Sequence, residues 1–156
     1  MTSLVPITRD NWRDALDVRV QPERLSWVAT SDPVGLILLA KCAVRPDGQE
    51  WFPFLFLDDD DKTVGVIGVG VAGDAAWLHH VLIDVHAQGQ GHGRAQLKAL
   101  ARWVQSEHPG VTRIGLNVAK DNVTAWRLYS SLGFEVIETT LDGQSITMAY
   151  LEEVAA

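Results

Sequence analysis

Apolar residues along the chain recur with two periods, an alternating one typical of strands and a helical one with spacings of about three to four. Runs that alternate or stay apolar, bounded by turn residues, predict strands at residues 4–8, 50–57, 63–71, 77–85, 112–119, 134–140 and 145–151. Apolar residues at positions 97, 100, 101 and 104 predict an amphipathic helix over 92–107, which His108-Pro109-Gly110 stops.

Capping residues and helix breakers predict further helical segments. They lie at about residues 12–19, 23–29, 33–44 and 122–133. Asp10 or Asn11 is expected to cap the first of these segments. Asp32 is expected to cap the third, with Pro33 at its first helical position. Asn122 is expected to cap the last.

The order of these elements indicates the fold class. A strand, two helical segments, three antiparallel strands, a helix, a strand, a helix and two closing strands predict an α/β protein with a mixed sheet. This order fits neither a doubly wound sheet nor a barrel. The chain has no internal repeat, low-complexity linker or break in composition, so we expect residues 1–156 to form one domain.

Several residues modify the expected strands. Pro53 lacks a backbone donor and indicates that its strand lies at a sheet edge or contains a bulge. The acidic run 58–61 is better explained as a solvated hairpin tip than as a metal site, because adjacent acids in one run cannot all converge on an ion. Gly65, Gly68 and Gly70 leave room for something to approach their strand closely.

Composition narrows the classes of function. The chain has 156 residues, 47% of them apolar and 21% charged, with a net charge of −7. This balance argues against a nucleic-acid binder and weakly favours cationic small molecules. Cys42 is the single cysteine, which excludes an internal disulfide. With no signal peptide, and with an apolar run over 34–40 too short to span a bilayer, we expect a soluble, cytoplasmic protein.

A glycine-rich stretch, Gln88-Gly89-Gln90-Gly91-His92-Gly93-Arg94, lies between an expected strand and an expected helix. Such a loop gathers main-chain N–H groups at the positive end of a helix, which predicts an anion site suited to a diphosphate. The dinucleotide pattern Gly-x-Gly-x-x-Gly does not fit, and no Gly-Lys-Ser/Thr follows. From the loop alone, a plain turn remains an equal alternative.

A second informative stretch runs from Asn122 to Phe134. Asn122 lies seven residues before Tyr129, about two helical turns, so the two side chains are expected near one helix face. From spacing alone, Tyr129 is better explained as a core aromatic than as a catalytic group.

Together, the two stretches resemble the GCN5-related N-acetyltransferase (GNAT) superfamily. The acetyl-CoA loop of that family, Arg/Gln-x-x-Gly-x-Gly/Ala, is matched by Gln88, Gly91 and Gly93. Its second motif, Asn-x-x-Ala-x-x-Leu-Tyr-x-x-x-Gly-Phe, is matched by Asn122, Ala125, Leu128, Tyr129, Gly133 and Phe134. The resemblance covers residues 4 to 151 and implies a single-domain GNAT-like fold with a mostly antiparallel seven-stranded sheet and about four helices.

The N-terminal third also resembles the bacterial spermidine/spermine N-acetyltransferase subgroup. Segments 7–13, 18–20, 22–23 and 27–29 carry this resemblance. The chain departs from the subgroup's usual residues at Arg24, Trp27 and Ser31, where Gln, Phe and Asn are usual.

The resemblance implies acetyl-CoA as cosubstrate, no metal, and a set of site residues. The cofactor-binding residues it implies are His80, Val81, Leu82, Ile83, Gln88, Gly89, Gln90, Gly91, His92, Gly93, Arg94, Asn122 and Tyr129. A strand bulge would open a slot for the pantetheine arm, and the Leu82 amide would stabilise the reaction's oxyanion. Tyr129 would protonate the departing thiolate, and unperturbed pKa values near 10 for phenol and alkyl thiol make that transfer nearly balanced.

The general base and the acceptor residues stay open. Asp84, His79, His80 and Glu50 are candidate bases, and strand alternation allows at most one of the two histidines to line the slot. Candidate substrate-binding residues are Glu23, Trp27, Asp32, Glu50 and Asp84.

The predicted function is acetyl-CoA-dependent N-acetylation of a small primary amine, with spermidine or spermine favoured. The alternatives are a protein or peptide N-terminal acetyltransferase and a non-catalytic acyl-CoA-binding module. We expect no nucleic-acid or membrane partner. Exposed strand edges, together with the resemblance, allow a homodimer.

Overall fold

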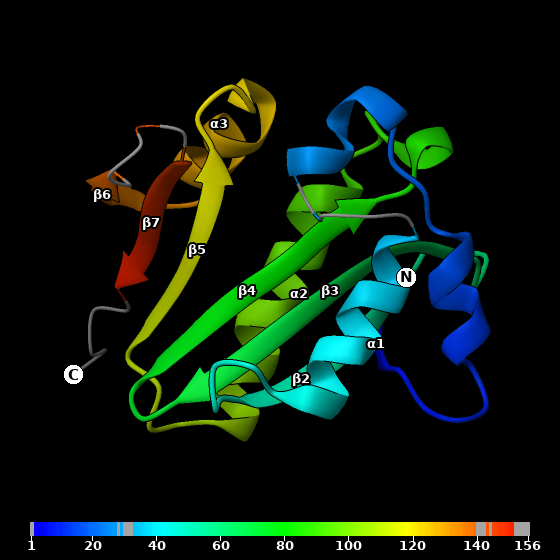
Figure 1. Ribbon diagram of the computed structural model, residues 1–156, viewed down its shortest axis with the longest axis horizontal. Helices are drawn as coiled ribbons and strands as arrows, with labels where there is room; N and C mark the ends of the chain where they lie inside the picture. Colours follow the sequence, from blue (N-terminus) through cyan, green and yellow to red (C-terminus); the bar gives the residue numbers. More distant parts are fainter. Residues whose placement is uncertain (1, 28, 30–32, 140–142, 144, 152–156) are drawn as a thin grey trace.

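A central sheet organises the molecule in the computed structural model, which describes residues 2–27, 29, 33–139, 143 and 145–151 (Figure 1). The strands are β1 (Ser3–Pro6), β2 (Glu50–Leu57), β3 (Thr63–Ala72), β4 (Ala75–Ile83), β5 (Arg113–Ala119), β6 (Glu135–Thr139) and β7 (Ser145–Leu151). They form one seven-stranded sheet in the order β1-β2-β3-β4-β5-β7-β6. Of its neighbouring pairs, β4 and β5 alone run parallel. The predicted mixed, mostly antiparallel sheet is confirmed.

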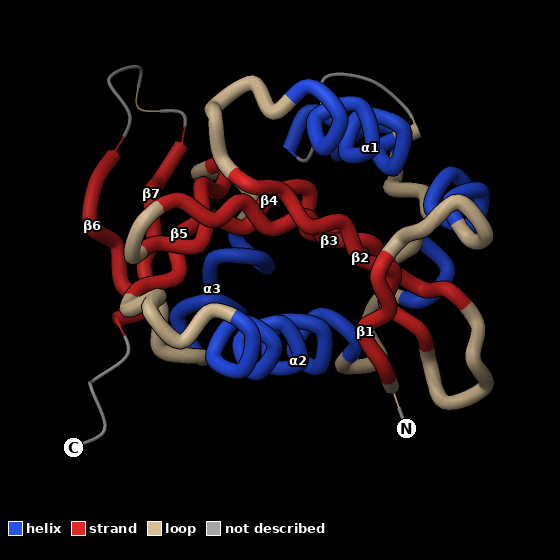
Figure 2. Tube along the Cα trace, turned by 90° about the horizontal axis from the view of Figure 1, so that it is seen from below, coloured by secondary structure: helices blue, strands red, loops and turns tan. Residues whose placement is uncertain are grey.

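Helices cover both faces of this sheet. The α-helices are α1 (Val34–Val44), α2 (His92–Glu107) and α3 (Val123–Ser131), and the 3-10 helices are η1 (Trp12–Asp17), η2 (Pro22–Trp27) and η3 (Val85–Ala87). Figure 2 shows α1 on one face and α2 with α3 on the other. Within the described ranges, no helix has the length and apolarity that a membrane span requires.

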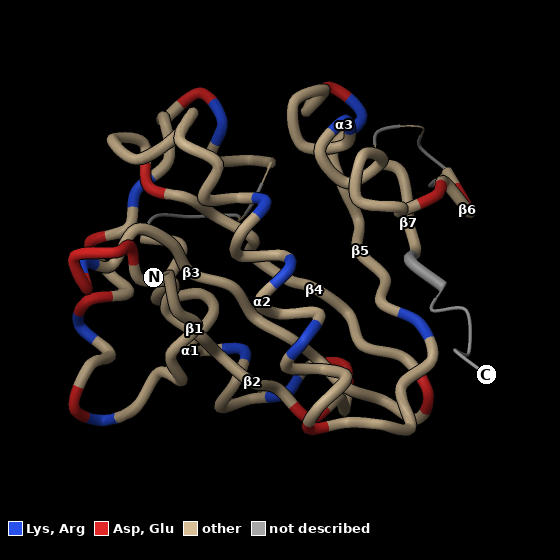
Figure 3. Tube along the Cα trace, turned by 180° about the vertical axis from the view of Figure 1, so that it is seen from behind, with Lys and Arg blue, Asp and Glu red and all other residues tan. Residues whose placement is uncertain are grey.

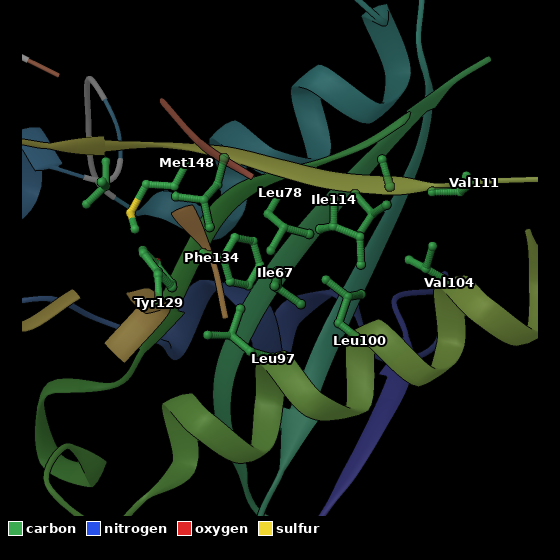
Figure 4. Close-up of a cluster of buried hydrophobic side chains, with 14 of the residues drawn as sticks. Ile67, Leu78, Leu97, Leu100, Val104, Val111, Ile114, Tyr129, Phe134 and Met148 are labelled. Carbon is green, nitrogen blue, oxygen red and sulfur yellow. The ribbon is translucent and has the colours of Figure 1, made fainter. Parts of the chain in front are cut away.

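Each face of the sheet has its own apolar core. The larger core packs residues such as Ile67, Leu100 and Phe134 between the sheet, α2 and α3 (Figure 4). The smaller core packs Leu38 of α1 and Ala15 of η1 against the opposite face. Burying apolar surface on both faces, at about 25 cal/mol per Å², holds the central strands rigidly in place. These strands support the site described below.

The three glycines of β3 accommodate other parts of the protein. A Cβ atom at Gly68 would collide with Leu38, and one at Gly70 would collide with Gln49. At Gly65, a Cβ would lie 2.7 Å from the carbonyl oxygen of Leu82. The close approach predicted from these glycines is therefore made by α1, by the α1–β2 turn and by β4.

Two predictions about helix starts differ from the structure. The first helical segment is the 3-10 helix η1, and Asn11 is its N-cap residue, as one of the two predicted alternatives had it, but makes no side-chain cap bond to the helix. Instead the Asn11 side chain accepts a hydrogen bond from the Thr8 amide at 2.7 Å and donates one to the Pro6 carbonyl at 3.0 Å. Pro33 is the N-cap residue of α1 and not its first helical residue, because its ψ of 141° is extended. Asp32, the predicted cap, lies outside the described residues.

The predictions for β2 and the turn after it have different outcomes. Of the two alternatives predicted for the strand of Pro53, an edge position is wrong, since β2 lies between β1 and β3, whereas a bulge is present in β2. Its bulge falls between Phe56 and Leu57, away from Pro53. Pro53 is tolerated because β1 pairs no further than Phe54. The acidic run forms the β2–β3 turn, where Asp58 accepts bonds from two turn amides, and acidic positions lie mostly in turns and at element ends (Figure 3).

Candidate functional site

A gap between β4 and β5 is the starting point of the site. The two strands pair only from Ala75 opposite Arg113 to Leu78 opposite Leu116, although β4 continues to Ile83. Beyond these pairs the strands diverge toward the end of the sheet where α3 lies (Figure 1). Main-chain groups on this part of β4 therefore have no neighbouring strand on the β5 side.

A bulge in β4 accompanies the gap, as predicted. Gly68 of β3 lies opposite His79, but Val66 lies opposite Leu82, so β4 contains one extra residue. His80, inside the bulge, has a φ of 54°, a left-handed conformation that non-glycine residues adopt rarely. His80 and Val81 therefore lie between the two regular pairs, Gly68 with His79 and Val66 with Leu82.

The register also fixes which amides face the gap. The Asp84 amide donates to the Val64 carbonyl of β3 at 2.7 Å. Since main-chain groups alternate sides along a strand, those of Leu82 also face β3, and those of Ile83 face the gap. The Leu82 amide is thus directed away from the gap, contrary to the sequence expectation, because the extra residue shifts the alternation.

The glycine-rich loop lies beside the end of β4 and leads into α2. Gly89 and Gly91 have φ values of 79° and 81°, and a Cβ atom on either would meet nothing within 4 Å. Gly91 is the N-cap residue of the 16-residue helix α2. Its geometry therefore places main-chain N–H groups and a positive helix end next to open space, as an anion site requires.

A cavity of about 360 Å³ connects this loop with the gap. Its walls come from η2, the end of β4, the loop, α2 and α3. Among the predicted residues, it is lined by Trp27, Val81, Leu82, Ile83, Gln88, Gly89, Gly91, His92, Gly93, Arg94, Asn122 and Tyr129. Gln90 is exposed outside this lining.

Two side chains of the loop hold it in place. The Gln88 amide donates to the Ile83 carbonyl at 3.0 Å and accepts a bond from Gln21 at 3.0 Å. Arg94 donates to the Ser131 hydroxyl of α3 at 2.7 Å. The side chain of Gln88 thus fixes the shape of the loop.

Tyr129 lies where the cavity reaches the gap. Asn122 accepts a hydrogen bond from the Ala125 amide at 3.3 Å, the predicted N-cap of α3, and so fixes the start of the helix that carries Tyr129. The Tyr129 ring is 7% exposed and packs 5.8 Å from Phe134 (Figure 4). Burial raises the pKa of the Tyr129 phenol from 10 to about 12, so the phenol is protonated at neutral pH.

A second cavity of about 210 Å³ opens on the other side of the gap. It shares Trp27, Val81, Asn122, Ala125 and Tyr129 with the first cavity and adds Lys41, Leu78, His79, His80, Leu116, Asn117 and Val118. Both histidines line it, so the prediction that at most one would do so is wrong. The bulge at His80 breaks the alternation on which that prediction rested.

His79 is held by partners on the α1 side of the sheet. Its ring stacks on Trp51 with the centroids 4.2 Å apart, and its Nε2 lies 3.4 Å from Gln49 Oε1. Burial, helped by the neighbouring charges of His80 and Lys41, lowers the pKa of His79 from 6.5 to about 4. The imidazole is therefore neutral at physiological pH.

This shifted pKa predicts a stability loss in mild acid. Between pH 6.5 and about 4 the unfolded chain binds a proton at His79 that the folded chain does not, so lowering the pH favours unfolding. After discounting for the partial exposure of the ring, we expect His79 to contribute about 1–2 kcal/mol to this loss. Urea unfolding at pH 7 and 5 measures it. His79→Phe should reduce the difference between the two pH values, and the exposed His86, replaced by Gln, serves as the control.

The predicted acidic substrate residues are not gathered at the site. Asp84 accepts hydrogen bonds from the Arg19 amide at 2.7 Å and the His86 amide at 3.1 Å, and so caps η3. Glu23 and Glu50 are exposed and line neither cavity, and Asp32 is outside the described residues. In the described part of the chain, no group of three or more His, Cys, Asp or Glu residues has metal-binding geometry.

The structure adds two polar residues that sequence reasoning missed. Gln96 of α2 is fully buried and lines the larger cavity, and its Nε2 donates to the Val66 carbonyl at 3.1 Å. Its Oε1 has no hydrogen-bond partner among the described residues. Lys41 lines the smaller cavity. The sequence contained a signal for each. Gln96 is a polar residue one turn before Leu100 on the apolar face of its helix, and Lys41 is a single charged residue in an otherwise apolar helix.

Comparisons with known proteins agree with this geometry. The model of the acetyltransferase (GNAT) family matches residues 5–134. A probable spermine N(1)-acetyltransferase of Bacillus subtilis subsp. natto (strain BEST195) is 31% identical over 148 residues, covering 83% of this chain and 84% of that protein. The spermine/spermidine N(1)-acetyltransferase of Bacillus subtilis (strain 168) is 30% identical over the same shares of the two chains.

Solved structures have the same fold at low identity. Spermidine N-acetyltransferase from Vibrio cholerae, in complex with CoA and spermine, has a TM-score of 0.73 and 17% identity, covering 97% of this chain and 95% of that chain. Aminoglycoside acetyltransferase AAC(6')-Ib, in complex with coenzyme A, has a TM-score of 0.74 and 19% identity over 98% and 96% of the two chains.

Proposed function

The chain belongs to the acetyltransferase (GNAT) family, and we therefore propose that it transfers the acetyl group of acetyl-CoA to a small primary amine. It is an acyltransferase, and acetyl-CoA is its cosubstrate. The observation that carries the proposal is Tyr129 at the junction of two cavities, one beside a phosphate-binding loop and one across the gap.

The larger cavity fits a CoA-type ligand. The glycine conformations leave open space above the main-chain amides around Gly91, where a diphosphate would be bound. The buried Gln96 Oε1 is an acceptor without a partner among the described residues, and the pantetheine arm carries amide N–H donors. The gap-facing amide of Ile83, whose carbonyl accepts from Gln88, would pair with that arm as a strand amide would.

The proposed reaction is a direct transfer. The acceptor amine first loses a proton to water or a base, and its nitrogen then bonds to the acetyl carbon and gives up a second proton to solvent. The carbon–sulfur bond breaks, and its electron pair stays on sulfur, which takes a proton from Tyr129. Tyr129 is reprotonated from solvent, so the products are an amide, a thiol and one released proton. Val81, in the bulge and in both cavity linings, replaces Leu82 as our candidate amide for the oxyanion.

The pKa values of the Tyr129 phenol and of the leaving thiol are not matched, which differs from the sequence-based expectation. Burial raises the pKa of Tyr129 to about 12, whereas an unperturbed thiol such as that of Cys has a pKa near 8.5. Full transfer to a free thiolate is therefore uphill, and Tyr129 would contribute mainly as a hydrogen-bond donor to the charge that develops on sulfur. We place its contribution in that step, where a hydrogen bond to a charged acceptor is strongest.

Polyamines are the first acceptor class to test. The two curated relatives above are named for spermine or spermidine acetylation, and the net charge of −7 favours cationic molecules. A thiol-release assay with acetyl-CoA against spermidine, spermine, aminoglycosides, amino acids and short peptides tests the proposal. Turnover of peptides alone would favour the N-terminal acetyltransferase. CoA binding without turnover of any amine would favour the binding module. Homodimerisation and a cytoplasmic location stay predictions.

A further inference from the structure

We infer that Lys41 selects the acceptor, and that the preferred amine carries an anionic group, such as a carboxylate, at its other end. This inference rests on the proposed function and refines it, because it concerns the molecule that enters the smaller cavity. It departs from the polyamine class that the relatives' names suggest.

Lys41 is placed at the acceptor cavity by an otherwise apolar helix. Helix α1, Val34–Val44, has the sequence VGLILLAKCAV and contains no other charged residue. The helix packs Leu38 into the core above β3, and Lys41, almost one turn later, lines the smaller cavity. A partly buried cation on an apolar helix is costly unless an anion accompanies it. Lys41 forms no ion pair with any carboxylate in the described part of the chain.

The other described polar residues of this cavity do not neutralise that charge. They include the neutral amides of Asn117 and Asn122, the phenol of Tyr129, and the imidazoles of His79 and His80, and His79 is neutral at physiological pH. No described carboxylate lines the cavity, and Asp47, whose charge also acts on His79, lies outside its lining. A diamine would bring a second cation beside Lys41, whereas a carboxylate would form a charge-assisted hydrogen bond with it.

The cavity also orients such an acceptor. Val81 and Tyr129 lie where the two cavities meet, so the reacting amine belongs at that end. Lys41 enters the lining from α1 and belongs to the smaller cavity alone. An ω-amino acid satisfies both ends, with its amine toward the thioester and its carboxylate toward Lys41.

Three acceptors with the same carbon length test the inference directly. They are γ-aminobutyrate, putrescine and n-butylamine, which differ only in an anionic, cationic or neutral far end. With saturating acetyl-CoA, we expect kcat/KM to be highest for γ-aminobutyrate, by roughly tenfold or more over putrescine. A preference for putrescine over γ-aminobutyrate in the wild-type enzyme would overturn the inference.

Substitutions at Lys41 identify the group responsible. Lys41→Met keeps the length of the side chain and should lower kcat/KM for γ-aminobutyrate by roughly ten- to a hundredfold, mainly through KM. It should lower kcat/KM for n-butylamine much less than for γ-aminobutyrate, and Lys41→Arg should retain most of the preference. Lys62→Met, at the exposed β2–β3 turn, is the matched control. An equal loss for all three amines in Lys41→Met would mean a structural role and would overturn the inference.

The failure of this inference is distinguishable from failure of the proposed function. If the amines are acetylated but Lys41→Met changes no preference, the acetyltransferase remains and the Lys41 assignment falls. If no amine is acetylated, calorimetric titration of the CoA-saturated protein with γ-aminobutyrate and putrescine decides. Binding of γ-aminobutyrate that Lys41→Met abolishes would keep the recognition site without the chemistry. Equal binding of γ-aminobutyrate by the wild type and Lys41→Met, or no binding at all, would overturn both the Lys41 assignment and the proposed function.

Discussion

Replacing Tyr129 by Phe should lower turnover by roughly ten- to ten-thousandfold, the range that a lost general acid costs. The substitution removes one hydroxyl and keeps the ring that packs against Phe134. Affinity for CoA should change little, because the loop at the start of α2 is untouched. Single-turnover kinetics and calorimetric titration with CoA measure the two effects separately.

Ser130→Ala is a suitable control for Tyr129→Phe, since it removes an exposed hydroxyl from the next position of α3. It should leave both turnover and CoA affinity unchanged. Turnover of Tyr129→Phe equal to that of the wild type would exclude the proposed role. The raised pKa of Tyr129, about 12, adds a second criterion. Because the phenol stays protonated, its titration should cause no alkaline loss of activity through about pH 10.

Replacing Gly91 by Val should weaken CoA binding by roughly ten- to a hundredfold, the loss of one or two charge-assisted hydrogen bonds from main-chain amides. Gly91 has a φ of 81°, which a β-branched residue adopts only with strain, and its Cβ would enter the open space above the loop. Calorimetry with CoA gives the affinity, and thermal unfolding gives the cost in stability.

Gly48→Val separates the two effects of the Gly91 substitution. Gly48 has a φ of 67° in the exposed α1–β2 turn, and a Cβ there also meets nothing within 4 Å. Both variants should therefore lose similar stability, but only Gly91→Val should lose CoA affinity. Equal CoA affinity in the two variants would place the diphosphate site elsewhere.

Local patterns predicted the elements well, because strand alternation, helical spacing and glycine-rich turns are properties of short segments. They also identified the loop at Gly91 and the helix that carries Tyr129. Periodicity did not distinguish the 3-10 helix η1 from an α-helix, since a single turn has similar spacing in both. The missing donor of Pro53 left an edge strand and a bulged strand as alternatives, because the partner of a strand depends on segments far away in the sequence.

Most of the corrections at the site have one cause. The extra residue at His80 shifts every following position of β4, which turns the Leu82 amide toward β3 and brings both histidines to one cavity. A bulge is a mismatch between two strands, so the sequence of β4 alone does not contain it. Lys41 was missed for a similar reason, because only the packing of α1 over the sheet brings it into the same cavity lining as Asn117 and Tyr129.

The short pairing between β4 and β5 has a consequence for the order in which the reactants bind. Because the sheet is open there, two cavities meet at Tyr129, and neither a donor bound in one nor an acceptor bound in the other would have to leave before the other reactant arrives. The single thiol, Cys42, lines neither cavity, and burial raises its pKa to about 11, so it is a poor relay for an acetyl group. The architecture thus favours simultaneous occupancy by both reactants over a modified-enzyme route.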